Sequence, residues 1–423
     1  MKFTLPEDTI PNVKLSKTLR AALVREAETV VRETIHANEA FLENGSRFPT
    51  SDWRFVRAKQ GLNVYCQRSG PTGSSYSRKT GLVSPISPTI PARTPSLSLS
   101  HPIATEKSKR RGKSLMVLHG AIDGNLDDCM FGSLATTEET WRWRSSYVYE
   151  GLDEARLLCT LKGPTAEDPF RFLGLKWFTK ELPSVLSGIM QQRDFLIIEA
   201  TGLTLDSNGE RVGYFLMHSV SLPGIVPEFP QLGLMREEIS ACYIDRQLGA
   251  NQVEMYCRSF LNPRGKPLNR LTAVIAAEAL LSAISIIDYA YIRKLTWLVK
   301  NNQERMSARR CRTRRQSGAF PRSRRCQMCD KSFSRLALNV GAECQICRGL
   351  VCKNCYVVKK MTVDFSTRGA VKQCAVRVCV CCLLEAKEKS VWEMALDGVS
   401  ETRSEASSSV ASGQRRYTFS RLE

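Results

Sequence analysis

The chain has 423 residues, of which 61 are Lys or Arg and 42 are Asp or Glu, giving a formal net charge of +19. This length predicts about two domains, and the 43% of hydrophobic residues excludes a chain that is disordered throughout. The charge predicts an anionic partner, which is a membrane face, a nucleic acid or an acidic protein.

The first residues, MKFTLPEDTI, contain no apolar signal-peptide core. The sequence also holds 16 cysteines. We therefore expect a reducing compartment, in which the cysteines that bind no metal stay free thiols.

The first elements are a helix and two strands. A helix is predicted over 14–44, because Leu19, Leu23, Ala27, Val30, Thr34 and Phe41 recur mostly at helical spacing. Two strands are predicted over 53–67, around the turn Lys59-Gln60-Gly61. Ser, Thr, Pro and Gly then dominate 69–114, which predicts a disordered insertion.

The next part of the chain is rich in strands. A buried strand is expected over 115–120, a helix over 125–134 and a second helical segment over 150–159. Further strands are expected over 170–178, 195–205, 211–222, 239–246 and 252–261. Turn residues at 206–210 and 248–251 predict two hairpins among them.

The most apolar helix is predicted over 267–299 and would be ~45–50 Å long. Its stretch 271–292 has the length of a membrane span. Glu278 and Asp288 lie within it, and each would cost a few kcal/mol at bilayer depth. We therefore expect this helix to pack across a curved sheet.

This order of elements is that of an α+β helix-grip domain with an antiparallel sheet and a long C-terminal helix. It resembles the START lipid-binding domains over roughly residues 50–299. The run Trp53-Arg54-Phe55-Val56 resembles the START opening, and Val253-Glu254-Met255-Tyr256 through Pro263-x-Gly265-x-Pro267 resembles its close. The resemblance implies lipid binding or transfer, with the C-terminal helix as a lid.

A strongly bent sheet that grips an apolar helix leaves a concave, mostly apolar cavity. From strand and helix facing, the residues expected to line this lipid cavity are Met217, Ile275, Ala279, Ile286 and Tyr289. The alternative is a cavity filled by side chains, in which case the domain is only a scaffold.

A basic linker is predicted over 300–325, where ten cations face the single acid Glu304. The cations are Lys300, Arg305, Arg309, Arg310, Arg312, Arg314, Arg315, Arg322, Arg324 and Arg325. Each cation near an anionic leaflet contributes about 1 kcal/mol before screening. A membrane surface is the favoured partner and a plain linker the second reading. Nucleic acid comes third, because no aromatic residue interleaves the arginines of 305–315.

Four Cys-x-x-Cys pairs follow: Cys326/Cys329, Cys344/Cys347, Cys352/Cys355 and Cys379/Cys382. Four soft sulfurs in a tetrahedron suit Zn²⁺, so we expect two structural zinc ions rather than disulfides. Only four residues separate Cys347 from Cys352, which makes it difficult for adjacent pairs to share an ion. The first and third pairs are therefore expected to hold one zinc, and the second and fourth pairs the other.

This layout resembles the FYVE zinc finger and its Rab-effector relatives. The matching features are Phe333, Leu350-Val351-Cys352 and Val376-Arg377-Val378-Cys379. A RING finger fits less well, because no His lies in the segment. The basic phosphoinositide-binding run of the family is absent from 339–345, and its Trp-x-x-Asp before the first Cys is also absent. The resemblance implies phosphate or membrane contacts at Arg377 and, with the linker, at Arg322, Arg324 and Arg325.

A helix-grip domain followed by this finger resembles the START–FYVE proteins of water moulds and related protists. The expected domains are an N-terminal helix (1–49), the START-like domain (50–299, with the insertion 69–114), the basic linker (300–325), the finger with a C-terminal helix (326–396) and a disordered tail (397–423).

The sequence contains no Gly-Lys-Ser/Thr loop, no Gly-x-Ser-x-Gly elbow and no His-Glu-x-x-His. All-sulfur zinc sites are also closed to substrate. We therefore expect a non-enzyme that binds or transfers lipid, is cytoplasmic, and is peripheral on anionic, endosome-type membranes. The alternative is an adaptor whose finger binds a small GTPase or another protein beside an inert START-like scaffold. A RING-like ubiquitin ligase is the third hypothesis.

Overall fold

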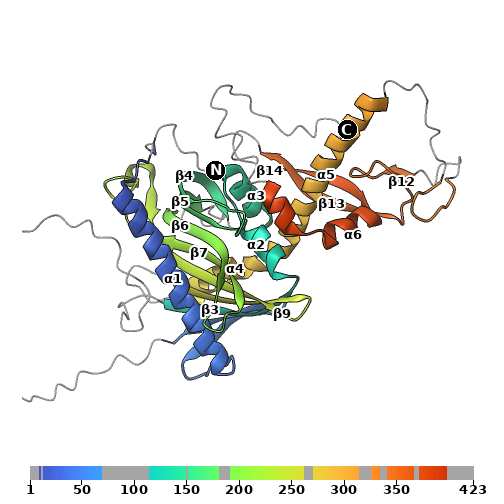
Figure 1. Cartoon of the computed structure of the whole chain (residues 1–423). Helices are drawn as coiled ribbons and strands as arrows, with labels where there is room; N and C mark the ends of the chain where they lie inside the picture. Colours follow the sequence, from blue (N-terminus) through green and yellow to red (C-terminus); the bar gives the residue numbers. More distant parts are fainter. Residues whose placement is uncertain are drawn as a thin grey trace, which may run out of the picture.

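The computed structural model describes residues 9–10, 13–68, 114–148, 151–180, 191–261, 270–313, 325–333, 341–365 and 371–397 (Figure 1). The predicted insertion up to residue 113 and the predicted tail from residue 398 lie outside this range, and so does linker segment 314–324.

One ten-stranded sheet forms the body of the larger domain. Its strands are β1 (Trp53–Lys59), β2 (Leu62–Gln67), β3 (Ser114–Asp123), β4 (Leu152–Lys162), β5 (Phe172–Lys180), β6 (Gln192–Leu205), β7 (Arg211–Ser219), β8 (Leu234–Arg236), β9 (Ile239–Leu248) and β10 (Gln252–Leu261). Their order is β1-β2-β3-β10-β9-β7-β6-β5-β4, with β8 beside β6. Neighbours along this path are antiparallel, and β8 runs parallel to β6.

Both hairpins predicted from turn residues are confirmed. The turn between β6 and β7 contains Gly209 at φ 77°, and the turn between β9 and β10 contains Gly249 at φ 60°. Glycine adopts this left-handed backbone without the steric cost that a side chain would add. The turn residues therefore predicted correctly which strands pair in these two hairpins.

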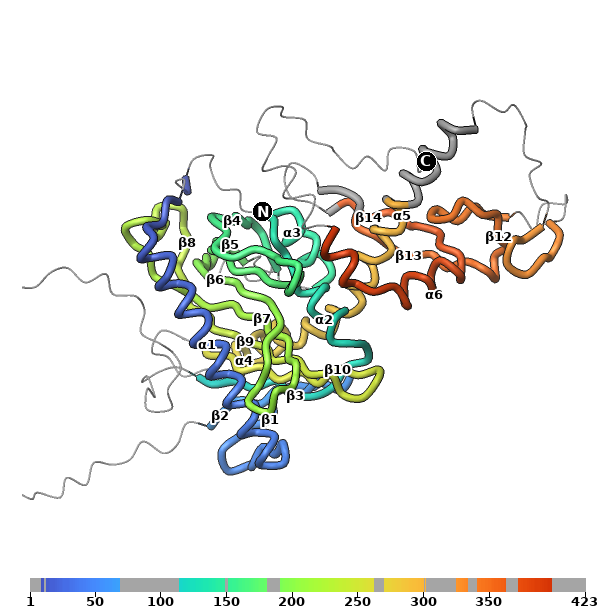
Figure 2. The backbone as a smooth tube through the Cα atoms, in the orientation of Figure 1, coloured from blue at the N-terminus to red at the C-terminus, as the bar shows by residue number. Residues whose placement is uncertain are grey.

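Helices cover both faces of the sheet. Helix α1 (Lys17–Glu43) crosses one face and shares a core with Leu216 of β7. The preceding residue in the chain, Phe215, points to the other face and joins the core beneath the helix α4 (Arg270–Leu281). Figure 2 shows α1 and α4 on either side of the strands. The α+β helix-grip fold expected from the sequence is confirmed.

Two short helices follow β3, and here one prediction is wrong. Helix α2 (Leu126–Ser133) begins at the cap Asn125, as expected, and α3 (Glu138–Tyr147) begins at Thr137. Segment 150–159, predicted as helical, contains β4 instead. Pairing with β5 satisfies the backbone of this segment and decides its structure.

The long apolar helix is broken in the middle and extends further than predicted. After α4, a 3₁₀ turn η3 (Ser282–Ser285) leads into α5 (Ile286–Thr313). At the break, the hydroxyl of Ser282 donates to the carbonyl of Ala279 (2.7 Å), and that of Tyr243 donates to the carbonyl of Leu280 (3.0 Å). Such side-chain bonds to helix carbonyls compete with the regular ladder. The first half of the predicted linker is therefore a continuation of α5.

By length and composition, the stretch Arg270–Val299 is the one described helix that could cross a membrane. Core helices of soluble proteins pass the same test. Here α4 buries Ala273, Ala277 and Leu281 in the larger domain, and Glu278 pairs with Arg57 of β1.

The C-terminal finger is built from two hairpins and a helix. They are β11 (Ala342–Glu343) with β12 (Leu350–Val351), β13 (Tyr356–Phe365) with β14 (Val371–Cys379), and α6 (Val380–Glu388). A further helical turn segment spans 391–397. The finger lies against α5, whose Leu295, Leu298 and Val299 are buried in one core with the finger cysteines (Figure 1).

The C-terminal helix was expected as part of the finger (326–396), but its last part packs on the larger domain. Val391, Met394 and Ala395 are buried in a core with residues of α2 and with Phe170, and the rings of Phe170 and Trp392 meet edge to face at 5.4 Å. The cause is burial: this segment covers apolar surface that the larger domain would otherwise expose.

Candidate cavity and metal centres

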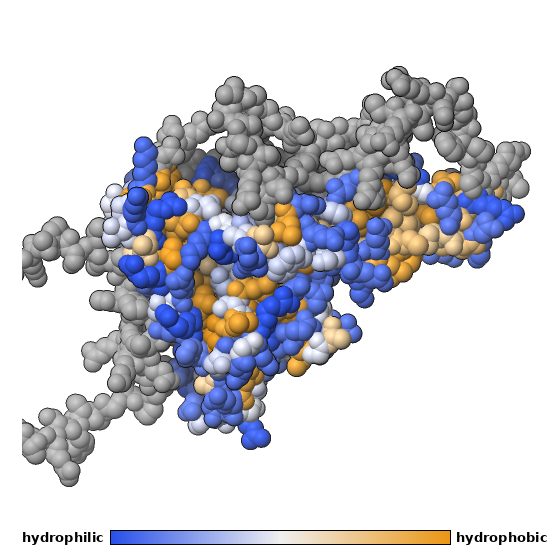
Figure 3. All heavy atoms as spheres, in the orientation of Figure 1, coloured by the Kyte–Doolittle hydropathy of each residue, from blue (hydrophilic) through white to orange (hydrophobic). Residues whose placement is uncertain are grey.

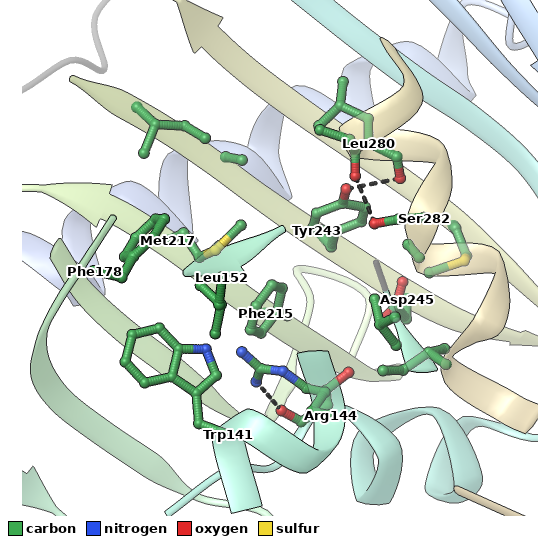
Figure 4. A pocket seen from close by; sticks show the side chains of 18 of the residues that line it. Trp141, Arg144, Leu152, Phe178, Phe215, Met217, Tyr243, Asp245, Leu280 and Ser282 are labelled. Atoms are coloured by element: carbon green, nitrogen blue, oxygen red, sulfur yellow. Dashed lines mark hydrogen bonds between the residues drawn. The ribbon is translucent and has the colours of Figure 1, made fainter. Parts of the chain in front are cut away.

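A cavity of about 80 Å³ lies between the sheet and the helices α3, α4 and α5. Figure 4 shows Met217 and Phe215 on one side of it, Trp141 on another and Leu280 across from them. The lining residues are Ser133, Trp141, Arg144, Val148, Leu152, Phe178, Lys180, Phe215, Met217, Ile239, Ala241, Tyr243, Asp245, Met255, Ala279, Leu280, Ser282, Ala283 and Ile286. Most of them are apolar, so the cavity suits a predominantly hydrocarbon occupant.

The cavity is smaller than the roughly 300–1,000 Å³ of ordinary ligand pockets. A lipid-sized occupant therefore needs one wall to move. The wall made by α4 joins the rest of the molecule through η3, and short 3₁₀ segments inside helices often mark hinges.

Three of the five residues predicted to line the cavity do so: Met217, Ala279 and Ile286. Ile275 is a correction, because its side chain is 47% exposed on the outer face of α4. Tyr289 is also a correction: it is buried one turn beyond Ile286 and stacks on Tyr147 at 5.3 Å, outside the lining.

A cluster of buried charges adjoins the cavity wall. Arg144 of α3 holds both carboxylate oxygens of Glu199 (3.0 and 2.8 Å), and the ammonium of Lys176 donates to Glu199 Oε1 (2.7 Å). All three side chains are at most 1% exposed. Burial alone would raise the pKa of Glu199, but the two cations outweigh it and lower that pKa.

Asp245 of β9 is a second buried acid, and it lines the cavity directly. Its Oδ2 accepts from the thiol of Cys129 (3.3 Å), while its Oδ1 has no hydrogen-bond partner among the described residues. Burial raises the pKa of Asp245 to about 7.

Sequence reasoning missed Arg144, Tyr243 and Asp245. Alternation along β9 was a usable signal, because Tyr243 and Asp245 are two residues apart and share the cavity face with Ala241. Arg144 gave no signal, since a cation on a short helix is usually exposed and its partner Glu199 is 55 residues away.

The eight finger cysteines form two groups of four. Cys326, Cys329, Cys352 and Cys355 make one group, and Cys344, Cys347, Cys379 and Cys382 make the other. Within each group the sulfur atoms lie within 4.8 Å of one another, so each group could hold a metal ion. This is the interleaved grouping expected from the sequence. Cys374 and Cys381 stay outside both groups, and all fifteen described cysteines of the chain are free thiols.

Sulfur spacing and backbone hydrogen bonds both fit a tetrahedral metal. Zn–S bonds of about 2.3 Å place ligand sulfurs about 3.8 Å apart. The separations are 3.7 Å for Cys329 and Cys352, and 3.8 Å for Cys347 and Cys379. In addition, the amide of Cys352 donates to the sulfur of Cys326 (3.3 Å). Such outer contacts are typical of metal-bound thiolates.

The first turn of each group repeats the same geometry. Asp330 follows Cys329 with φ 56°, and Arg348 follows Cys347 with φ 62°. In both turns the amide of this residue donates to the carbonyl of the first cysteine of the pair, at 2.9 and 2.8 Å. The left-handed residue costs some backbone strain. Both groups therefore place a left-handed residue directly after the second cysteine of the pair, and the two turns meet the same structural requirement.

The predicted phosphate-contacting arginines are only partly placed. Arg377 is exposed on β14, opposite Val358 of β13. Arg325 is exposed and pairs with Asp330 (2.8 Å). Arg322 and Arg324 lie outside the described residues.

No protein-family model matches the sequence, and no curated protein matches it. Several solved structures resemble part of the chain. Human STARD10 has a TM-score of 0.34 and 12% identity, over 59% of this chain and 77% of that chain. The human StarD13 (DLC2) lipid transfer and protein localization domain has a TM-score of 0.33 and 10% identity, over 60% of this chain and 95% of that domain. Human StAR-related lipid transfer protein 5 has a TM-score of 0.32 and 12% identity, over 61% and 96%.

Proposed function

We propose that this chain is a non-enzymatic lipid-binding protein whose finger binds two structural zinc ions and docks on anionic membranes. The observation that carries the lipid-binding part is the mostly apolar cavity between β9 and α4, with few polar groups on its wall. A pivot of α4 at η3 would enlarge the cavity for a lipid chain, so α4 acts as the lid. The proposed place of action is the cytoplasmic face of endosome-type membranes, as a peripheral protein.

Filling the cavity tests its use. Ala279→Trp places an indole in the lumen and is expected to reduce uptake of a fluorescent acyl-chain probe by at least about ten-fold, because the new ring occupies the ligand volume. Ile275→Trp is the matched control. It adds the same ring one turn earlier on the exposed face of α4 and should bind the probe like the parent chain.

Thermal unfolding of both variants shows whether either has lost its fold. Met217→Ala offers a second test, because it enlarges the lumen from the sheet side. Equal probe uptake by both tryptophan variants, with Met217→Ala unchanged as well, would contradict ligand binding in this cavity.

Zinc is the proposed metal because each group offers four cysteine sulfurs and no oxygen or nitrogen ligand. Thiolates select soft metals, and a closed tetrahedral set is typical of structural zinc. The two ions would be held by the ligand sets expected from the sequence, in a finger of the FYVE type. Such ions supply folding free energy and no substrate position, which favours a non-enzyme.

Membrane docking is proposed through the outer face of the β13–β14 hairpin. Val358 is 53% exposed there, and Lys360 and Arg377 are exposed on the same face. Figure 3 shows apolar side chains on the finger among hydrophilic ones. An apolar residue flanked by cations suits the boundary between headgroups and acyl chains.

Vesicle flotation tests the docking face. Reversing two charges in Lys360→Glu/Arg377→Glu should weaken binding to phosphatidylserine vesicles by at least about ten-fold, since each cation contributes on the order of 1 kcal/mol. Binding of the parent chain should fall as salt rises. The control Lys162→Glu changes a partly exposed cation of β4, paired with Glu28, and should bind as before.

An adaptor is the second candidate function, and one feature favours it. The turn that holds Cys344 and Cys347 is not uniformly cationic, because Glu343 lies exposed there and pairs with Arg348 (3.5 Å). In this case the finger would bind a small GTPase or another protein. Capture of such a protein at high salt, without vesicles, by both the parent and the charge-reversed chain would favour the adaptor over membrane docking.

A further inference from the structure

Helix α3 lies between the cavity and the finger, and it contacts both (Figure 1). Trp141, Arg144 and the capping residue Val148 line the cavity. At the C-terminal end of the helix, the hydroxyl of Tyr147 accepts a hydrogen bond from the amide of Thr362 in β13 (2.5 Å). One short helix therefore provides a wall of the cavity and a seat for the finger.

Tyr147 joins three elements at this contact. Its ring stacks on that of Tyr289 in α5, with 5.3 Å between the ring centroids, and Tyr289 follows the cavity residue Ile286 by three positions. The neighbouring Ser146 shares a hydrogen bond with the hydroxyl of Thr362 (3.1 Å). A shift of α3 at the cavity wall would therefore act on β13 through a chain of direct contacts.

The hairpin β13–β14 depends on this seat for its order. It forms a two-stranded sheet of its own, and a two-stranded hairpin is at best marginally stable in water. At one end, Tyr356 of β13 pairs with the metal-ligand residue Cys379 of β14. Towards the other end, Thr362 is 4% exposed and is held by α3. The metal centre and α3 thus support the hairpin from opposite ends.

The strand that α3 holds also bears the proposed docking face. Side chains alternate along a strand, so Val358 and Lys360 lie on the same face of β13 as Thr362, and both are exposed. The contact between α3 and Thr362 therefore also fixes the position of the docking face.

An occupant of the cavity would order α3. The lumen of about 80 Å³ is a space in which the side chains of the wall make no packing contacts, so the dispersion energy of the wall is incomplete. A bound chain packs against Trp141 and Val148 and restricts the motion of the helix. The hairpin then loses less conformational entropy when it is held at Tyr147, which is the condition for positive coupling without a large structural change.

We propose that filling the cavity orders the β13–β14 hairpin through α3, and that Tyr147 is the coupling residue. This inference rests on the proposed function and adds a mode of regulation to it, since a loaded cavity would favour docking of the finger. By linkage, an ordered hairpin raises the affinity of the cavity for its occupant by the same factor.

Hydrogen exchange of the full chain tests the coupling. A fluorescent acyl-chain probe is added to saturation, without vesicles, and exchange of the β13–β14 amides is compared with and without it. We expect the probe to slow this exchange about five-fold in the parent chain, the lower end of ordinary coupling between two sites. In Tyr147→Phe, which removes only the hydroxyl and keeps the ring, the slowing should be lost.

Tyr291→Phe is the matched control. It removes the hydroxyl that donates to the carbonyl of Leu383 in α6 (2.7 Å). This contact joins the finger to α5 without involving α3, so the slowing should persist. Thr362→Val breaks the second hydrogen bond of the α3 contact and should also weaken the effect. Thermal unfolding checks that each variant is folded.

The outcomes separate the two proposals. If the parent chain does not bind the probe, the proposed function and this inference are both overturned. If the probe binds but leaves exchange in β13–β14 unchanged or faster, or if Tyr147→Phe responds like the parent chain, the inference alone is overturned and lipid binding stands.

Discussion

Replacing Glu199 by glutamine is expected to lower the free energy of unfolding by about 3–5 kcal/mol at neutral pH, the usual cost of breaking a buried ion pair. Glutamine has nearly the same shape but no charge. Arg144 and Lys176 would then lose the carboxylate that compensates them, at sites where at most 1% of each side chain is exposed. Urea denaturation measures the loss, with the m-value showing whether unfolding stays two-state.

The matched control is Glu237→Gln, which removes a carboxylate from its pair with Arg193, where both side chains are about a quarter exposed. Solvent screens such a pair, so the expected loss is below about 1 kcal/mol. Equal losses in the two variants would contradict the special role of the buried cluster.

The buried cluster also predicts how the difference in unfolding free energy between the parent chain and Glu199→Gln changes with pH. The cations lower the pKa of Glu199 in the folded chain below its ordinary value of 4.5. The carboxylate therefore contributes stability above that value, and the contribution is lost as the pH falls through the lowered folded-state pKa. The gap between the parent chain and Glu199→Gln should accordingly narrow in acid.

The fold could be predicted largely because its signals are local. Turn glycines such as Gly209 and Gly249 predicted the hairpins, and apolar residues at helical spacing predicted α1. The errors arose where distant contacts decide. Pairing with β5 turned 152–162 into a strand, and the hydroxyls of Tyr243 and Ser282 bond to carbonyls at the break in the long helix.

The two candidate sites differ in how far the sequence reveals them. The metal ligands come in pairs of cysteines with two residues between them, so the sequence alone indicates a metal site, and the structure groups the ligands as expected. The cavity is assembled from residues of many elements, and nothing in the sequence marks its charged residues as buried. Lys176 lies between Leu175 and Trp177 as an ordinary strand cation would, yet it is fully buried because Glu199 lies 23 residues away in sequence and 2.7 Å away in space.

The attachment of the finger to the larger domain had no sequence signal at all. The amide of Thr362 in β13 donates to the hydroxyl of Tyr147 in α3 (2.5 Å), and the hydroxyl of Tyr291 in α5 donates to the carbonyl of Leu383 in α6 (2.7 Å). Helix α3 also carries Trp141, which lines the cavity. The finger and the cavity wall are therefore parts of one packed unit. Unfolding of the finger is expected to destabilise the cavity wall as well.

Cys344→Ser is accordingly expected to open its own metal group, to destabilise the β13–β14 side of the finger and to loosen the helix beneath it. Metal binding contributes on the order of 10 kcal/mol to the folding of small zinc domains, and a finger of this size has too little apolar area to fold alone. Cys344 is fully buried in the same core as Leu295 and Leu298 of α5, so these leucines lose their cover when the group opens. Elemental analysis should show about two zinc ions per parent chain and about one in the variant.

Hydrogen exchange locates the damage, and Cys381→Ser is the matched control. Cys381 is exposed, adjoins the ligand Cys382 and belongs to neither group, so its loss should leave zinc content and exchange unchanged. In Cys344→Ser, exchange should rise in β13 and β14 and in the part of α5 that packs on the finger, while α1, which packs on the far face of the sheet, keeps its protection. Unchanged exchange in β13 and β14 after removal of zinc by a chelator would mean that apolar burial alone holds the finger together. A rise confined to the finger, with α5 still protected, would mean instead that the metal centres and the larger domain are energetically independent.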